Sequence, residues 1–343
     1  MRKKSLLFFF LFNTCISVFG QKNTAQIFSD TLVKPRMRVI IDNDFGGDPD
    51  GLFELVHHLL SPSVDIRGII GSHLRPGDGF DRSKETATHA KQKIEEVLSI
   101  MNLGKTYSVY QGSNFQLEND STPQPSDAAK AIVTEAMTGD AKLPLYIVCG
   151  AGLTDIASAY LIEPRIAERL TLVWIGGPEY PELAIPPPGY TTLEYNLGID
   201  IKAGQVIFNK SSIPIWQIPR NVYRQVIMPY SSLLTKVRTQ GKIGEFLTSS
   251  LEKVMQMSIK YHFNVGEVYI VGDSPLVLLT ALQSSFEPDP SSSFYVLRPS
   301  PLINNQGIYE VNHKGRNIRV YTQLDVRLLL DDFYSKLTLF NQR

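Results

Sequence analysis

Cysteine is nearly absent from this chain, which has two among 343 residues, Cys15 and Cys149. We expect Cys15 to be removed with an N-terminal leader, so the remaining chain has no second cysteine for an intrachain disulfide. Cys149 then has two interpretations: a small buried apolar residue, or a thiolate nucleophile that needs a neighbouring base. A sequence cannot show such a spatial neighbour, and we favour the buried apolar residue.

An excess of one charge sign is absent as well, since 34 Lys and Arg residues balance 34 Asp and Glu residues. A general nucleic-acid binder needs a basic surplus to neutralise the phosphates of its partner, so we expect no nucleic-acid partner. Hydrophobic residues (43%) and charged residues (20%) occur at ordinary globular frequencies. This composition excludes disorder, collagen, coiled coil and a multi-span membrane protein as descriptions of the whole chain.

The N-terminal apolar stretch, residues 5–20, is shorter than the roughly 18 residues that a membrane span needs. It follows the cations Arg2, Lys3 and Lys4 and ends with Gly20, a small residue of the kind found before a cleavage site. We therefore predict a signal peptide at residues 1–20 and a polar leader at residues 21–35. The protein is expected to be exported, periplasmic or secreted, with no membrane association after cleavage.

Short apolar runs alternate with segments of helical periodicity along most of the chain. Strands are predicted at residues 37–41, 64–70, 106–110, 145–149, 170–175 and 214–218, and helices near residues 52–60, 82–100, 126–137, 153–161, 231–237 and 243–261. A hairpin around His313-Lys314-Gly315 and a helix from Gln323 to about Phe340 are expected at the C-terminal end.

This alternation predicts an α/β fold: a mostly parallel, open sheet with helices on both faces. We expect a single domain at residues 36–343, because no linker divides two cores and no repeat is present. Ligands of such folds bind beyond the carboxyl ends of the strands, so the residues after each strand are the candidates for a site.

Four aspartates follow the first predicted strand within nine positions: Asp42, Asp44, Asp48 and Asp50. Burying several like charges is costly, and a hard cation such as Ca²⁺, which takes six to eight oxygen ligands, removes that cost. Asp48-Pro49 also fits a helix N-cap followed by proline at the first helical position. Capping explains only one of the aspartates, so the segment favours a metal site.

The segment from Asp42 to Asp50 resembles the N-terminal aspartate signature of the inosine–uridine-preferring nucleoside hydrolase family. Four later segments resemble that family's motifs in the same order: residues 148–157 (Val-Cys-Gly-Ala-Gly-Leu-Thr-Asp-Ile-Ala), 174–177 (Trp-Ile-Gly-Gly), 194–196 (Glu-Tyr-Asn) and 272–276 (Gly-Asp-Ser-Pro-Leu). The resemblance spans about Arg38 to Phe333. It implies a nucleoside hydrolase-like, Rossmann-like arrangement of the predicted sheet.

The resemblance also implies an activity: Ca²⁺-dependent hydrolysis of the N-glycosidic bond of ribonucleosides or related N-ribosides, which releases base and ribose. It implies that Asp44 binds the ion and accepts a proton from an ion-bound water. Further metal ligands are then Asp50, the main-chain carbonyl of Cys149, and Asp273. The resemblance also implies a homodimer or homotetramer, a supporting role for Asp42 in the loop, and contacts to ribose hydroxyls from Asp48, Glu194 and Asn196.

Two departures from the family pattern leave alternatives open. Asp48 and Asp50 are separated by Pro49, whereas the family places two adjacent aspartates after the turn, so their roles are exchangeable. Gly272 stands where the family often has a histidine that protonates the leaving base, and glycine cannot donate a proton from a side chain.

Other residues are candidates for the missing leaving-group acid: His262, His73 and the Arg220–Tyr223 segment. His57 and His58 lie on a predicted helix, where we expect them at the surface. The segment from Gly177 to Tyr195 is either a lid over the ribose or a plain surface excursion.

The alternative function is a non-catalytic or altered sugar-binding relative that retains the metal and ribose pocket, and Gly272 motivates it. A dinucleotide-binding oxidoreductase is not supported, because no G-x-G-x-x-G follows the first strand. The acidic loop that stands there would repel a pyrophosphate.

Overall fold

The computed structural model describes residue 28 and residues 32–139, 141–190, 193–262, 264–283 and 293–343. The predicted signal peptide and most of the polar leader therefore lie outside the described residues. Among the helices of the described part, none combines the length and the apolar composition needed to cross a membrane.

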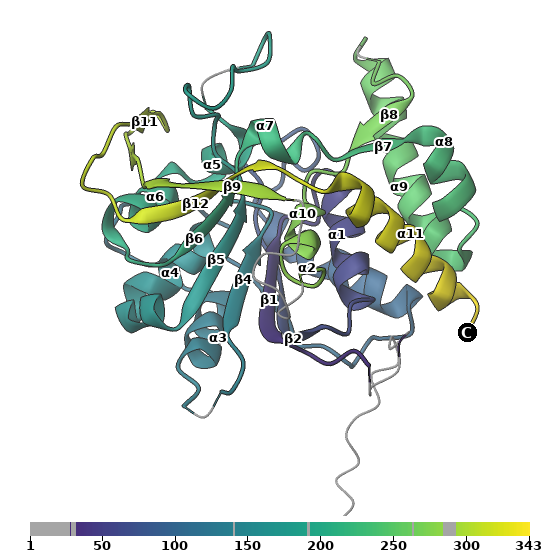
Figure 1. The fold of residues 1–343 in the computed structure, drawn as a ribbon, viewed down its shortest axis with the longest axis horizontal. Coiled ribbons are helices and arrows are strands. Elements are labelled where there is room, and N and C mark those ends of the chain that lie inside the picture. Colours follow the sequence, from purple (N-terminus) through teal and green to yellow (C-terminus); the bar gives the residue numbers. More distant parts are fainter. Residues whose placement is uncertain (1–27, 29–31, 140, 191–192, 263, 284–292) are drawn as a thin grey trace, which may run out of the picture.

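An eight-stranded sheet forms the middle layer, in the order β3-β2-β1-β4-β5-β6-β12-β9 (Figure 1). All neighbouring strands run parallel except the edge strand β9, which is antiparallel to β12. This arrangement confirms the predicted α/β fold. The strands are β1 (Met37–Asn43), β2 (Val64–Gly71), β3 (Val109–Gln111), β4 (Leu145–Cys149), β5 (Leu170–Ile175), β6 (Ile215–Ile218), β9 (Phe294–Pro299) and β12 (Asn317–Gln323).

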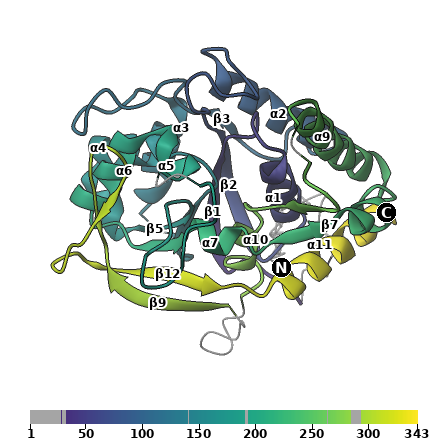
Figure 2. The same ribbon diagram turned by 90° about the horizontal axis from the view of Figure 1, so that it is seen from above.

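Helices cover both faces of the sheet (Figures 1 and 2). One face packs against α1 (Asp50–Leu59), α2 (Thr86–Ile100), α9 (Gly241–Lys260), α10 (Pro275–Leu278) and α11 (Val326–Asn341). The other face packs against α3 (Asp127–Ala136), α4 (Thr154–Ile162) and α6 (Ile201–Gln205). The uninterrupted apolar run Val39-Ile40-Ile41 of β1 follows from this arrangement, because Val39 and Ile41 enter the first core and Ile40 enters the second.

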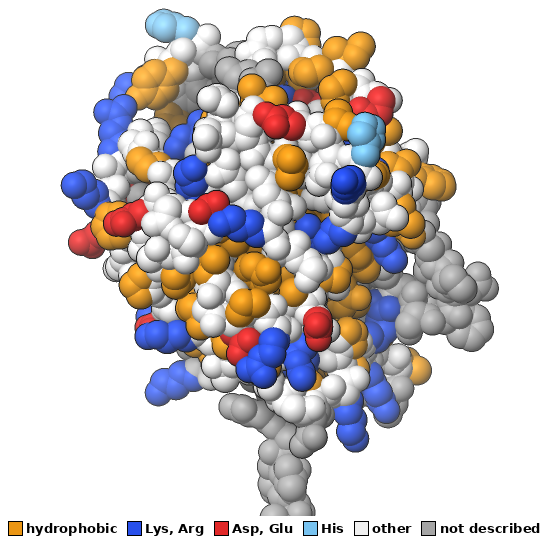
Figure 3. All heavy atoms as spheres, turned by 90° about the vertical axis from the view of Figure 1, so that its left-hand side faces the viewer, with side chains coloured by type: hydrophobic (Ala, Val, Ile, Leu, Met, Phe, Trp, Pro, Cys, Tyr) orange, Lys and Arg blue, Asp and Glu red, His pale blue; other side chains and the backbone are white. Residues whose placement is uncertain are grey.

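Shorter elements complete the described chain: α5 (Tyr195–Ile199), α7 (Arg220–Tyr223), α8 (Tyr230–Ser232), a 3₁₀ helix (Pro164–Glu168), π-helical turns (Val206–Lys210 and Leu233–Val237), and the antiparallel pair β7 (Ile227–Pro229) and β8 (Val268–Ile270). On the face shown in Figure 3, basic side chains lie among acidic and apolar ones and form no continuous basic patch.

The small C-terminal hairpin is confirmed, but its strands are β10 (Leu302–Ile303) and β11 (Tyr309–Glu310), so its tip precedes the predicted turn. The turn at His313-Lys314-Gly315 instead leads into β12, which pairs with β9 rather than with β11. The reason is that β12 buries the apolar side chains of Ile318, Val320 and Tyr321, which it does by completing the large sheet between β6 and β9.

The strand order places a crevice at the carboxyl ends of β1 and β4. These strands are neighbours, yet the chain continues from β1 to α1 on one face of the sheet and from β4 to α4 on the other face. The β1–α1 and β4–α4 loops therefore diverge and leave a crevice between them. Ligands of open α/β sheets bind in a crevice of this kind.

Candidate active site

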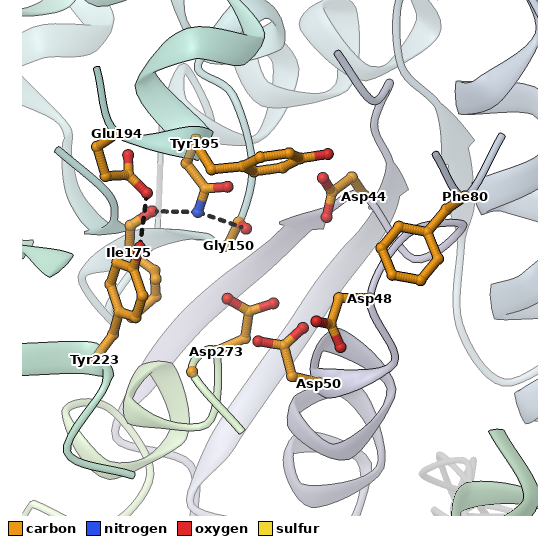
Figure 4. Close-up of a pocket in the computed structure, with 12 residues that line it drawn as sticks. Asp44, Asp48, Asp50, Phe80, Gly150, Ile175, Glu194, Tyr195, Tyr223 and Asp273 are labelled. Carbon is orange, nitrogen blue, oxygen red and sulfur yellow. Dashed lines mark hydrogen bonds between the residues drawn. The ribbon is translucent and has the colours of Figure 1, made fainter. Parts of the chain in front are cut away.

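A pocket of about 260 Å³ lies at these strand ends (Figure 4). Carboxylates, aromatic rings and glycines surround it: Asp44, Asp48, Asp50, Phe80, Gly150, Ile175, Glu194, Tyr195, Asn196, Tyr223, Gly272 and Asp273. The structure thus brings together six of the predicted site residues, Asp44, Asp48, Asp50, Glu194, Asn196 and Asp273, although they come from distant parts of the chain.

The β1–α1 loop delivers the first three carboxylates. A turn closed by the Gly47 N–H, which donates to the Asp44 carbonyl at 2.8 Å, directs the chain around the pocket. Asp48 does not cap α1: the helix begins at Asp50 after Pro49 and has no side-chain cap. Instead, Asp48 accepts the Tyr269 hydroxyl at 2.7 and 2.9 Å, so the capping interpretation of this residue is wrong.

Asn43 connects this loop to Asp273, which lies 230 residues further along the chain. Its Nδ2 donates to Asp273 Oδ2 at 3.0 Å, and its Oδ1 accepts the Asp44 N–H at 2.9 Å. Gly51 packs so closely on Asn43 that an added Cβ would lie 2.9 Å from Nδ2. The amide therefore fixes the floor of the pocket.

Glu194 and Asn196 form the opposite wall, where α5 begins. Glu194 Oε2 accepts the N–H groups of Leu197 (3.0 Å) and Gly177 (2.8 Å), and its Oε1 accepts the Tyr223 hydroxyl at 2.9 Å. Asn196 Nδ2 donates to the carbonyls of Gly150 (3.1 Å) and Ile175 (2.8 Å), which follow β4 and end β5. Both side chains are held rigidly at strand ends.

The carboxyl groups in the pocket destabilise one another as anions. Burial raises the pKa of Asp44, Asp50 and Asp273 well above the usual value, and the negative charges of Asp50, Asp273 and Asp44, respectively, raise them further. Desolvation by the surrounding protein also raises the pKa of Asp48 to about 6, although its side chain keeps contact with solvent. A bound cation would reverse these shifts.

The donor set fits a hard cation by chemistry, because it consists of carboxylate oxygens that lack a basic partner at the pocket. Across the described ranges, no three His, Cys, Asp or Glu side chains stand within reach of one ion. An ion would therefore have to draw the carboxylates closer together. Which of Asp48 and Asp50 would be its main ligand stays a prediction.

Cys149 ends β4 directly before Gly150, which lines the pocket. Its thiol is fully buried and donates weakly to the Gly152 carbonyl at 3.4 Å. Burial, and then the charge of Asp42, raises the pKa of this thiol well above its normal value. The buried-residue interpretation of Cys149 is confirmed, whereas the role of its carbonyl as a metal ligand stays a prediction.

The histidines proposed as leaving-group acids do not line the pocket. His262 is exposed at the end of α9, with a φ of 59°. His73 is buried, and its ring nitrogens contact the Leu74 carbonyl (2.9 Å) and Thr154 Oγ1 (2.8 Å). Of the third candidate, the Arg220–Tyr223 segment, Tyr223 does reach the pocket.

Asp42, predicted to support the loop, is fully buried and accepts the Ser72 hydroxyl.

In the segment after Gly177, Glu179 forms a buried ion pair with Arg220 (2.7 Å), and the Tyr190 ring lies under the guanidinium of Arg220. Whether this segment closes over a ligand stays a prediction.

Sequence reasoning missed Phe80 and gave Tyr195 and Tyr223 no role as aromatic rings of the pocket, although Tyr223 belongs to the predicted Arg220–Tyr223 segment. Phe80 comes from the β2–α2 loop, Tyr195 from α5 and Tyr223 from α7 (Figure 4). The Tyr223 ring occupies the space in front of Gly272, where an added Cβ would lie 3.2 Å from Cδ2. An aromatic ring thus stands beside the position where the family often has histidine.

The predicted surface location of His57 and His58 is wrong, because both side chains are buried. His57 Nε2 contacts Asp332 at 2.7 Å, which ties α1 to α11. His58 contacts the buried Glu54 through Nδ1 and Thr280 Oγ1 through Nε2 at 3.1 Å. α1 packs between the sheet and the helices α9, α10 and α11, and its residues Gly51 to Leu59 are all buried, so it has no exposed polar face.

Comparison with known proteins gives one family match. Residues 39–331 match the family model described as Inosine-uridine preferring nucleoside hydrolase. Among curated proteins, none matches this sequence significantly.

Several solved structures share the fold. A plant nucleoside hydrolase has a TM-score of 0.65 at 16% identity, covering 89% of this chain and 99% of its own. A purine-preferring ribonucleoside hydrolase from Gardnerella vaginalis has a TM-score of 0.64 at 17% identity, covering 89% and 100%. The type III effector protein XopQ, solved in complex with adenosine diphosphate ribose, has a TM-score of 0.54 at 13% identity, covering 90% and 93%.

Proposed function

We propose, from the premise that the chain belongs to the inosine-uridine preferring nucleoside hydrolase family and is an N-glycosidic hydrolase, a more specific reaction. In this proposal the protein cleaves ribonucleosides or related N-ribosides with the help of Ca²⁺. The observation that supports the proposal is the convergence of Asp44, Asp50 and Asp273 on one pocket with Glu194 and Asn196 (Figure 4). A riboside offers hydroxyls to these polar groups and a flat base to the aromatic rings.

Asp44, Asp50 and Asp273 would hold the ion, with the Cys149 carbonyl as a further ligand. When bound, the ion would lower the pKa of a water molecule near the sugar and so make it a better nucleophile. Asp44 would accept the proton of the attacking water, because its carboxylate lies in the same pocket as the other proposed ligands.

The ribose contacts follow from the polar wall. The Asn196 amide uses its nitrogen for protein carbonyls, and its oxygen has no hydrogen-bond partner in the described part of the chain. This oxygen is free to accept a ribose hydroxyl. The carboxylates of Asp48 and Glu194 already accept hydrogen bonds from the protein, and each oxygen has a second lone pair that can accept a ribose hydroxyl as well. Hydrogen bonds that strengthen as the ring flattens lower the barrier to bond cleavage.

Tyr223 takes part in the departure of the base in this proposal. Burial, and then the Glu194 charge, raises the pKa of its hydroxyl well above normal, so the group stays protonated in the working pH range. We propose that the hydroxyl turns from Glu194 to the leaving base as a hydrogen-bond donor. Gly272 leaves the room for the Tyr223 ring.

The alternative, a sugar-binding relative without catalysis, is supported by the same Gly272. Export through a signal peptide and assembly into a homodimer or homotetramer are also proposals. The first is tested by the N-terminal sequence of the purified protein, and the second by its mass in solution.

The test of the main proposal is base release from a nucleoside panel by the purified protein, with Ca²⁺ or with a chelator. We expect release that the chelator suppresses and that Asp44→Asn lowers by at least about 100-fold. Asp65→Asn, an exposed aspartate near the start of β2, serves as the control and should leave the rate unchanged. Calcium-dependent ribose binding without any base release would favour the sugar-binding alternative instead.

A further inference from the structure

A second cavity, of about 740 Å³, lies beside the active-site pocket. The β2–α2 loop and the segment after β3 form its walls, with these lining residues: Leu74, Arg75, Pro76, Gly77, Arg82, Ser83, Lys84, Thr86, Asn114, Phe115, Gln116, Leu117, Glu118 and Gln124. It is larger than the active-site pocket, and the proposed hydrolysis gives it no role.

Arg75 and Tyr195 form the wall between the two cavities. The Arg75 guanidinium lies 4.7 Å from the centroid of the Tyr195 ring and donates from Nη2 to the Tyr195 carbonyl at 3.1 Å. Tyr195 lines the active-site pocket, whereas Arg75 lines the second cavity. The sites are therefore neighbours that share one stacked pair of side chains.

Three cationic side chains surround the second cavity: Arg75, Arg82 and Lys84. None of them has an acidic partner within ion-pair distance in the described ranges, although most basic residues around them on α2 are paired. The Nε–H of Arg75 is buried and has no acceptor among the described residues. These groups can bind an anion without first breaking an ion pair.

Two acidic residues of the same loop, Asp78 and Asp81, already have partners of their own. Asp78 accepts the Tyr195 hydroxyl at 2.6 Å, and Asp81 contacts His89 at 2.6 Å. Glu118 is the one carboxylate in the lining, against the three cations. The cavity therefore keeps a positive excess in a chain that is neutral as a whole.

An exposed aromatic ring completes the cavity. Phe115 lies in the wall with 58% of its surface exposed, so its ring is accessible to a ligand in the cavity. Flat bases stack on such rings, and a phosphate group matches the guanidinium and ammonium donors. A ligand that combines both features is a nucleoside phosphate.

We propose that this second cavity binds a nucleoside phosphate, with the phosphates at Arg75, Arg82 and Lys84 and the base against Phe115. The binding needs neither the metal nor the hydrolysis of the neighbouring pocket. It requires only the cationic side chains and the ring, so it can be measured on protein without catalytic activity.

Isothermal titration of the purified protein in a chelator tests the proposal with ADP, inorganic pyrophosphate and adenosine as probes. We expect ADP and pyrophosphate to bind, and the Arg82→Gln/Lys84→Gln double variant to weaken both by at least about tenfold. Phe115→Ala should weaken ADP alone. Lys130→Gln, an exposed lysine on α3, is the matched control and should change nothing.

The proposal is overturned if ADP does not bind, or if ADP binds the double variant and the unchanged protein with equal affinity. Loss of ADP binding in Asp44→Asn would place the nucleotide in the active-site pocket and would also overturn it. Base release from nucleosides is measured separately, so failure of the hydrolase proposal does not affect the outcome here.

Discussion

The buried contact between Glu54, His58 and Thr280 permits a quantitative prediction. Thr280 donates its only hydroxyl proton to the Leu276 carbonyl at 2.6 Å, so His58 Nε2 must be the donor in its 3.1 Å contact with Thr280. Glu54 and His58 Nδ1 then share one proton. The contact joins α1, which begins at Asp50, to α10, which directly follows the Asp273 segment.

Replacing His58 by leucine leaves the Glu54 carboxyl buried without this partner. The other oxygen of that carboxyl, Glu54 Oε2, already lacks a hydrogen-bond partner among the described residues. Breaking one side of a buried pair of this kind costs about 3–5 kcal/mol. For a chain of 343 residues, this loss corresponds to a melting temperature about 4–7 °C lower. The double variant Glu54→Leu/His58→Leu removes both polar groups and should recover most of the loss.

Thermal unfolding in a chelator measures the stability, and calcium titration of the same variants measures the ion affinity. We expect His58→Leu to bind Ca²⁺ more weakly, because α1 begins at the proposed ligand Asp50 and α10 follows the proposed ligand Asp273. His89→Leu, which removes an exposed contact to Asp81, is the control and should cost less than about 1 kcal/mol. A His58→Leu protein as stable as the parent, or a double variant no better than the single one, would refute the reasoning.

Four further predictions concern the pocket. Because the pKa of Asp48 is raised from 3.8 to about 6 in the folded protein, the ion-free protein should lose stability as the pH rises from 4 to 7, and urea unfolding with and without Ca²⁺ should show the ion reversing that loss. Gly272→Ala should lower kcat/KM by about tenfold, since the new Cβ would lie 3.2 Å from the Tyr223 ring, and unchanged kinetics would contradict this close approach. Tyr223→Phe keeps the ring and removes the hydroxyl, so steady-state kinetics should show a fall in kcat of at least about 100-fold with a smaller change in KM. Cys149 should resist thiol reagents in the folded protein and react only in denaturant, as mass spectrometry would reveal.

The sequence predicted the parallel core of the fold because its strands are short apolar runs buried on both faces, as in β1 and β4. The carboxylate half of the pocket was predicted as well, since Asp44, Asp50 and Asp273 follow strands and belong to recognisable motifs. The placement of Asp273 next to Asn43 depends on the order of the strands in the sheet. Local motifs do not reveal this order, and only the family resemblance implied it.

The aromatic half could not be predicted in the same way. Phe80 lies in a loop and Tyr223 in a short helix, where no periodicity marks the direction of a side chain. Phe80 was therefore missed, and Tyr223 was predicted only as part of the Arg220–Tyr223 segment. The burial of His57 and His58 was missed for a different reason. An amphipathic helix is expected to keep one face in water, but three other helices pack around α1, and only tertiary structure reveals this cover.

The amide at position 43 explains why the acidic run Asp42-Asn43-Asp44 is interrupted in the middle. The side chain there must donate a hydrogen bond to Asp273 on one side and accept a hydrogen bond from the Asp44 main-chain N–H on the other. A carboxylate of the same shape can only receive, so aspartate at this point would turn the Asp273 contact into a repulsion. Asparagine is therefore the residue through which two distant acids of the chain are held as neighbours before any ion arrives.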